Sequence, residues 1–201
     1  MTADTAGRAA WVGVALLLGA CALAGWPLTR DAIDWQPQRA SSEPWRALTA
    51  VGVHYSGQHL GANLVGLAVT ALFGLVARAP VRLAMAWLAA WPLTQLSLLI
   101  RPELAHYGGL SGVLHAGVAV VVVWLLVAGT RAQRMAAGAV AIGLGAKLLS
   151  EAPWGPVLRH PPEWDIAVAP LAHTTGALAG TVCSALALWL PRSARLPGAD
   201  V

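Results

Sequence analysis

Charge is what this sequence has least of. Only 11% of its 201 residues are Asp, Glu, Lys or Arg, whereas soluble domains average about 25%. This excludes an ordinary soluble domain, and it also excludes a disordered chain, which needs high charge and low hydrophobicity. With 57% hydrophobic residues, the composition predicts an all-α, polytopic membrane protein. At about 20 residues per span, the length allows roughly six helices and no second domain.

Cysteine is also scarce. Cys21 and Cys183 lie in different apolar runs, without the spacing of a metal site or a disulfide framework. The net charge of +4 is carried almost entirely by Arg residues scattered singly at the ends of apolar runs, which is how membrane proteins use them. We therefore expect the lipid bilayer as a partner, and no nucleic acid, cofactor or metal.

Charged residues bound the apolar runs, and six runs are long enough, or nearly so, to cross a membrane. The fifth is the weakest, because it reaches the length of a span only if Lys147 extends to the membrane surface. The prediction is one membrane domain over residues 1–201, a six-transmembrane-helix bundle with spans at about 9–29, 52–77, 80–100, 108–129, 134–150 and 166–190.

Six spans place both termini on the same side of the membrane. That side carries seven basic residues and the other side six, so the positive-inside rule favours cytoplasmic termini by a small margin. The turns at 78–82 and 131–134 on that side are short and basic, which favours the same orientation.

Five polar residues lie at membrane depth, where ionisable groups are costly and often functional. His59 begins the second span, Asn63 follows it at i+4 on the same helix face, and Ser111 opens the fourth span. His115 lies one turn into the fourth span, and His173 about two turns into the sixth. All three spans run inward from the outside, so we expect their polar residues to converge near the outer surface.

These residue types indicate nucleophilic chemistry. A serine hydroxyl needs a base within hydrogen-bond reach, and His173 can serve Ser111 in this way. Backbone N–H groups at the start of the fourth span, with the side chains of His59 and Asn63, can stabilise an oxyanion. No Asp or Glu lies within a span, so the pattern predicts a Ser–His dyad rather than a triad.

Glycines support the same arrangement. Gly109 and Gly112 let the chain turn tightly around Ser111. Gly176 and Gly180 give the sixth span a smooth face, which allows it to pack closely enough for its histidine to reach the serine. Such pairs are more often simple packing motifs, and histidines within spans can instead ligate a haem or a metal.

Several other residues are expected at the membrane boundary. His54, His106 and His160 lie near the outer ends of the spans and are predicted to be surface residues. Six tryptophans are expected in an interfacial belt, namely Trp11, Trp26, Trp91, Trp154, Trp164 and Trp189.

Four elements of the sequence resemble the rhomboid intramembrane serine proteases. Trp45-Arg46 resembles the Trp-Arg pair of the first loop, and His59-Leu-Gly-Ala-Asn63 matches His-x-x-x-Asn. Gly109-Leu110-Ser111-Gly112 matches the nucleophile motif Gly-x-Ser-Gly. Ala172-His173-Thr-Thr-Gly176-Ala-Leu-Ala-Gly180 matches the Ala-His-x-x-Gly-x-x-x-Gly of the last core helix. The elements occur in the family's order and cover a core of about 43–182.

The resemblance implies a serine endopeptidase with Ser111 as nucleophile and His173 as base. It also implies His59 and Asn63, with the backbone of Ser111, as oxyanion donors. His115 stands where many rhomboids carry Tyr, and we expect it to stack on His173, although it can also act as a polar group in the cavity.

A narrower resemblance is to the rhombosortase branch, in Tyr107-Gly-Gly-Leu-Ser-Gly-Val-Leu-His115 and in Lys147-Leu-Leu-Ser-Glu151. One departure is Ala116, where that branch usually has Gly. The branch implies a bacterial inner-membrane enzyme whose active site faces the periplasm. Its substrates are membrane-anchored proteins with a C-terminal Gly-Gly motif, an apolar helix and a basic tail.

Two other functions are compatible with parts of the pattern. One is a catalytically inactive rhomboid-like protein that binds membrane clients; such proteins typically lack the Ser or the His, and both are present here. The other is a His-ligated haem or metal protein, which would need neither a Ser at a helix start nor an Asn beside His59.

Overall fold

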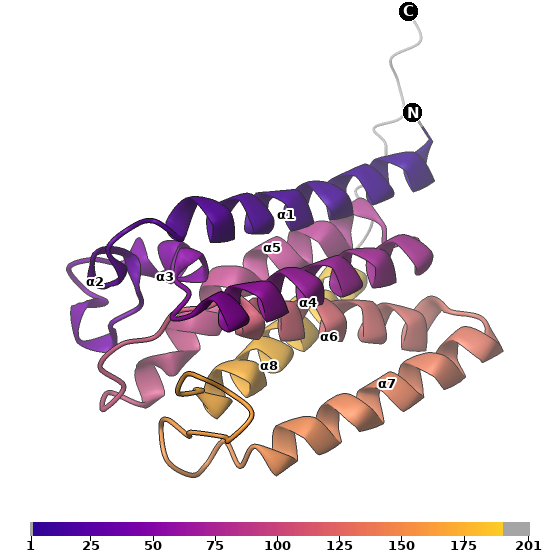
Figure 1. Cartoon of the computed structure of the whole chain (residues 1–201). Helices are drawn as coiled ribbons and strands as arrows, with labels where there is room; N and C mark the ends of the chain where they lie inside the picture. Colours follow the sequence, from indigo (N-terminus) through magenta and orange to yellow (C-terminus); the bar gives the residue numbers. More distant parts are fainter. Residues whose placement is uncertain (1, 191–201) are drawn as a thin grey trace, which may run out of the picture.

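The computed structural model describes residues 2–190 and is all-helical in that part of the chain (Figure 1). Residues 2–190 form six long helices, with short helical segments in some of the connections between them. The long helices are α1 (Ala3–Gly25), α4 (Gly57–Val76), α5 (Val81–Leu96), α6 (Ser111–Ala128), α7 (Arg131–Ser150) and α8 (Pro170–Trp189). The short segments are α2 (Arg30–Ile33), η1 (Pro37–Arg39), α3 (Arg46–Thr49), η2 (Ala50–Gly52) and η3 (Ser97–Ile100).

The sequence predicts six spans, and that count is not confirmed. Within residues 2–190, five helical segments have the length and hydropathy of a membrane span: α1, α4, α5 continued through η3, α6 and α8. The remaining long helix, α7, has 20 residues but carries Arg131, Arg134 and Lys147. It lies at the edge of the bundle (Figure 1) and buries only Ala137.

Side-chain caps explain where several helices begin. The hydroxyl of Thr2 accepts a hydrogen bond from the Thr5 N–H, so α1 begins six residues before the expected span. Ser56 caps α4 by accepting from the N–H of His59, and Thr130 forms a capping box at the start of α7. These caps satisfy backbone donors that no helical partner reaches. A charged residue such as Arg8 therefore lies inside its helix rather than at its end.

Two tryptophans form the centre of the core. Trp11 of α1 stacks on Trp87 of α5, with ring centroids 4.5 Å apart, and neither has exposed surface. Gly74 makes room for the Trp11 ring, since a Cβ there would overlap it. The belt prediction is therefore wrong for Trp11 and also for Trp91, which is buried. Trp26, Trp154 and Trp189 are exposed.

The closest helix pair is α6 with α8. A Cβ added to Gly176 would overlap the carbonyl oxygen of Gly112, and one added to Gly180 would overlap that of Ala116. The two backbones thus touch along two turns, which only small residues allow. This contact fixes the spacing between the start of α6 and the first turn of α8.

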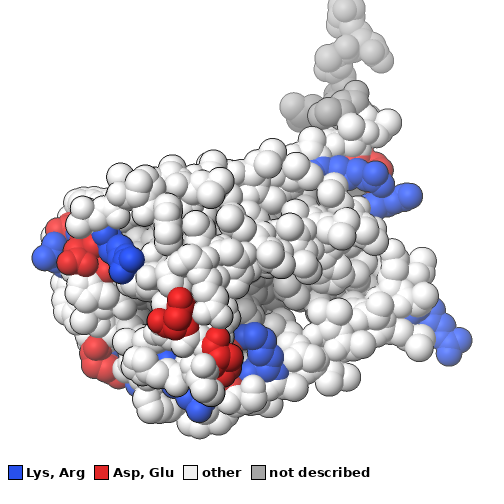
Figure 2. All heavy atoms as spheres, viewed as in Figure 1, with Lys and Arg blue, Asp and Glu red and all other residues white. Residues whose placement is uncertain are grey.

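Charged side chains gather at the two ends of the helices, with an uncharged band between them (Figure 2). One end, where α1 begins and the short turns before α5 and α7 lie, is mainly basic (Figure 2). Its described cations are Arg8, Arg78, Arg82, Arg131 and Arg134. The opposite end, with α2 and α3, carries side chains of both positive and negative charge (Figure 2). The uncharged band is the surface expected to face lipid.

The backbone contact predicts an asymmetry between two helical glycines. Gly180→Ala forces a methyl group into the α6 backbone and should destabilise the fold by about 1–3 kcal/mol. Gly138→Ala in α7 meets no neighbour within 4 Å and should be neutral or stabilising, because Ala is a better helix former than Gly. Unfolding of the purified protein in mixed micelles measures both effects. Equal effects at the two positions would contradict the packing described for α6 and α8.

Candidate active site

A serine and a histidine from different helices meet where α6 and α8 begin. Ser111 is the first residue of α6, and His173 lies in the first turn of α8. The Oγ atom of Ser111 is 2.9 Å from Nε2 of His173. His173 is only 7% exposed. The hydroxyl therefore has a ring nitrogen within hydrogen-bond distance, as activation of a serine requires.

The other ring nitrogen of His173 faces a carboxylate that sequence analysis missed. Nδ1 lies 2.7 Å from Oε2 of Glu151, the residue that ends α7. The sequence predicts a dyad because no Asp or Glu lies within a span, but Glu151 lies just beyond the fifth predicted span and reaches the histidine. Two features of the sequence point to it: its place directly after the fifth run, and its position in the Lys147–Glu151 segment that resembles the rhombosortase branch.

Glu151 is charged at neutral pH. Burial raises its pKa, but hydrogen bonds from His173 and Lys147 outweigh this effect and lower the pKa to about 2. Lys147 is one turn earlier on α7, and its Nζ lies 2.5 Å from Oε1.

His115 stacks on His173. The ring centroids are 4.4 Å apart and the planes are inclined by 16°. Nδ1 of His115 lies 2.7 Å from the backbone oxygen of Ser111, one turn earlier on α6. The stacked ring limits the rotation of His173.

His59 and Asn63 face the same site from the outer half of α4, and both are buried. Nδ1 of His59 accepts a hydrogen bond from the Tyr55 N–H, so the proton of the neutral ring is on Nε2. Nδ2 of Asn63 is buried and has no hydrogen-bond partner among the described residues. Both donors border Gly109, where an added Cβ would lie 2.9 Å from Nε2 of His59 and 3.8 Å from Nδ2 of Asn63.

Backbone hydrogen bonds hold the segment that leads into Ser111. Trp35 and Tyr107 exchange two of them, at 2.7 and 2.9 Å, and the N–H of Gly109 donates to the oxygen of Ala50 at 2.9 Å. Gly109 has φ of +130°, a conformation that a residue with a side chain rarely adopts. The loop between α1 and α4 thus sets the position of the serine.

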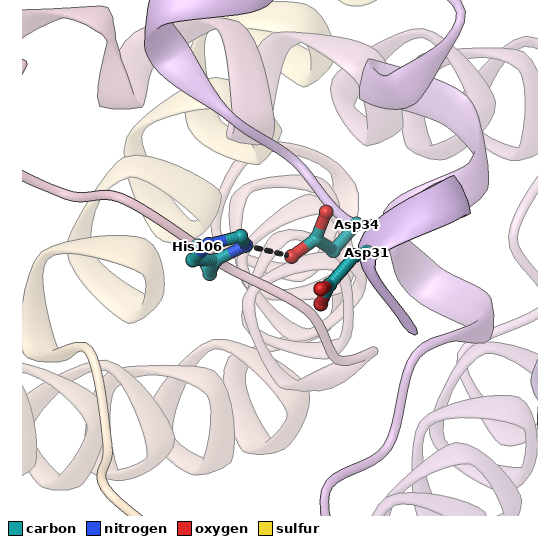
Figure 3. Close-up of side chains that lie close together, drawn as sticks. All are labelled: Asp31, Asp34 and His106. Carbon is teal, nitrogen blue, oxygen red and sulfur yellow. Dashed lines mark hydrogen bonds and ion pairs between the residues drawn. The ribbon is translucent and has the colours of Figure 1, made fainter. Parts of the chain in front are cut away.

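A buried ion pair stiffens that loop. Nη1 of Arg46 lies 3.2 Å from the carboxylate of Asp34, and their side chains are 5% and 1% exposed. Arg46 also pairs with Glu43. The second Asp34 oxygen is 2.6 Å from Nδ1 of His106, and Asp31 lies beside this pair (Figure 3). Three ligand-type groups meet here, but the guanidinium already supplies the positive charge beside Asp34.

The serine–histidine pair opens onto a cavity of about 970 Å³. Its outer wall is the connection between α7 and α8, which folds back on itself through two hydrogen bonds between Arg159 and Val168. Ser56 at the start of α4 bonds Asp165 of this connection at 2.7 Å. The cavity has the size of a ligand pocket, and Ser111 and His173 are both among the residues that line it.

The other predicted residues are distributed as follows. Gly112, Gly176 and Gly180 lie in the contact between α6 and α8, rather than on the cavity wall. His160 is exposed and His106 half-exposed. His54 is 2% exposed, so its predicted surface position is wrong; it packs behind His59, with ring centroids 4.9 Å apart.

The fold and the site define a helical membrane protein with a serine–histidine pair facing a cavity. Comparison with protein families agrees, since the Rhomboid domain matches residues 41–190. The chain belongs to the rhomboid family, whose members are generally intramembrane serine proteases. No curated protein and no solved structure shows significant similarity to the chain. The family match also implies a lipid bilayer and membrane-protein substrates as partners.

The buried ion pair leads to a stability prediction. Arg46→Ala leaves the Asp34 carboxylate buried without its main counter-charge, which typically costs about 3–5 kcal/mol. Arg39→Ala removes an exposed partner of Glu43 and should cost less than about 1 kcal/mol. Unfolding in mixed micelles compares the two variants. If Arg46→Ala is no less stable than Arg39→Ala, the loop does not depend on this ion pair.

Proposed function

We propose that this chain is an intramembrane serine endopeptidase in which Ser111 is the nucleophile and His173 the general base. The observation that carries the proposal is the 2.9 Å separation of Oγ and Nε2 at the wall of a large cavity. Membership of the rhomboid family supports the same activity.

In the first step, Nε2 of His173 takes the hydroxyl proton while Oγ of Ser111 attacks the substrate carbonyl carbon. The carbonyl oxygen becomes an oxyanion beside Gly109. Donors available there are Nε2–H of His59, the amide of Asn63 and the backbone N–H of Ser111. The C–N bond then breaks, and His173 gives its proton to the leaving amine. An acyl group remains on Ser111, and a second nucleophile such as water releases it by the reverse transfers.

The mainly basic end of the bundle, where α1 begins and α8 ends, is proposed to face the cytoplasm; the expected cytoplasmic location of the C-terminus itself falls outside the described residues. Arg residues are retained on the cytoplasmic side during insertion. The site lies at the opposite end of the bundle, where α4, α6 and α8 begin, and is proposed to face the periplasm from a bacterial inner membrane. Cleavage is then expected just below the outer surface.

A substrate must present an extended backbone to the serine, because helical peptide bonds are covered by their own hydrogen bonds. Glycines at the edge of an apolar helix unwind most easily, since Gly costs about 1 kcal/mol relative to Ala in a helix. The similarity to rhombosortases at His115 and at Lys147–Glu151 favours the same location. The proposed substrates are membrane-anchored proteins with a Gly-Gly pair, a C-terminal helix and a basic tail.

Loss of the nucleophile or of the base is expected to abolish cleavage. Ser111→Ala and His173→Ala should be nearly equally inactive, because the two side chains act as a unit. Asn63→Ala should retain more activity, as other donors remain, with a loss of about 10²–10³-fold typical of one oxyanion donor. Cleavage of a tagged membrane substrate by purified protein in lipid measures all three. Normal cleavage by folded Ser111→Ala would exclude the protease function and favour a client-binding role.

The substrate class has a separate test. A secreted reporter is fused to a Gly-Gly pair, an apolar helix and an Arg-rich tail, and is co-expressed with this protein. The reporter should be released, and replacing Gly-Gly by Leu-Leu should block release, because the helix then stays closed at its edge. Ser111→Ala provides the background. Equal cleavage of the Leu-Leu reporter would reject the sorting-signal class while leaving the protease function intact.

A further inference from the structure

Three side chains from three elements form a continuous chain of contacts across the site. Ser111 of α6 contacts Nε2 of His173, and Glu151 at the end of α7 contacts Nδ1 of the same ring at 2.7 Å. The two contacts use opposite nitrogens of one imidazole, so they coexist. The expected dyad thus has a carboxylate in the position that an orienting third residue occupies in serine hydrolases.

The carboxylate decides which ring nitrogen carries the proton. An ionised carboxylate only accepts hydrogen bonds, so Nδ1 of His173 must be the donor in this contact. In the neutral ring, Nε2 is then unprotonated and free to accept the Ser111 proton. The opposite tautomer would place a hydrogen on Nε2 and leave the ring unable to act as a base toward the serine.

Glu151 is itself held in place on both sides. Its other oxygen, Oε1, is 2.5 Å from Nζ of Lys147, and its backbone oxygen accepts a hydrogen bond from Nη1 of Arg159 at 2.9 Å. The Glu151 side chain is 22% exposed, so it is not a freely solvated surface group. A pair between Lys147 and Glu151 alone would be an ordinary helix-surface contact worth little. Glu151 differs from such a surface residue because its Oε2 atom contacts the buried imidazole of His173.

We propose that Glu151 is the positioning residue of a Ser111–His173–Glu151 triad, anchored by Lys147. The inference rests on the proposed protease function. During attack, the proton from Ser111 moves to Nε2, and the ring becomes an imidazolium. The negative charge of Glu151 stabilises that cation and holds the ring toward the serine, without itself accepting the proton.

Two other carboxylates near the site bond to residues other than His173. Asp165 bonds the hydroxyl of Ser56, and Glu103 pairs with Arg101. Glu103 is half-exposed and lies outside the cavity lining, which makes Glu103→Gln a matched control for charge loss at the same end of the molecule.

The test compares Glu151→Gln, Glu151→Asp and Glu103→Gln with the unaltered protein and with Ser111→Ala, in the same lipid. Glu151→Gln keeps the size of the side chain and removes its charge. Its kcat should fall by about 10²-fold, with KM changed less than about twofold, since both carboxylate oxygens of Glu151 are engaged by His173 and Lys147. Glu151→Asp keeps the charge and should be more active than Glu151→Gln. Glu103→Gln should match the unaltered protein.

A spectroscopic signature provides a second test that does not depend on a variant folding. Nitrogen-15 NMR of the unaltered protein, labelled at histidine, should show His173 protonated on Nδ1 and unprotonated on Nε2. The opposite tautomer would overturn the triad. So would a folded Glu151→Gln with kcat within about threefold of the unaltered protein. If the unaltered protein cleaves no better than Ser111→Ala, the proposed function itself fails, which is a different outcome.

Discussion

The structure of the site depends on the direct backbone contact between α6 and α8. At Gly112, Gly176 and Gly180 an added Cβ would overlap a backbone carbonyl oxygen of the facing helix, so the two backbones are in direct contact at these positions. Without a hydrophobic driving force between helices in lipid, such close packing is itself a main source of association. The 2.9 Å separation of Ser111 and His173 follows from this contact, because each residue lies within one turn of the helix start that the glycines bring together.

The loop between α1 and α4 imposes a second constraint on the position of Ser111. The loop between α1 and α4 holds the strand-like segment before Ser111 by the Trp35–Tyr107 pair, and buried Arg46 with Asp34 holds the loop. A reactive serine thus gains support from its own helix contact and from an outer polar network. Within the described residues, the long helix α7 buries a single residue, Ala137, and its C-cap residue is Glu151. Rigid elements therefore carry the nucleophile and base, while a peripheral helix carries the proposed orienting charge.

Much of the site was predictable from the sequence, because the direction of the spans places His59, Asn63, Ser111 and His173 at one depth. The contact of Glu151 with His173 was not predictable, because hydropathy patterns identify the spans but do not show where the connections between the spans lie. Trp11 shows the same limit: its burial depends on Gly74, 63 residues later, and no local pattern reveals that pairing. The weak fifth run lies within one continuous helix, α7, which carries Arg131, Arg134 and Lys147 and is not among the five segments with the length and hydropathy of a span.

The central claim is that Ser111 is activated by His173 within the folded bundle. The most direct measurement is reaction of the protein in lipid with a serine-directed phosphonate, followed by mass spectrometry of the labelled peptides. The account predicts one adduct, on Ser111, that forms in the unaltered protein and is lost in His173→Ala although that variant remains folded. Labelling of another serine, or equal labelling of Ser111 without His173, would contradict it.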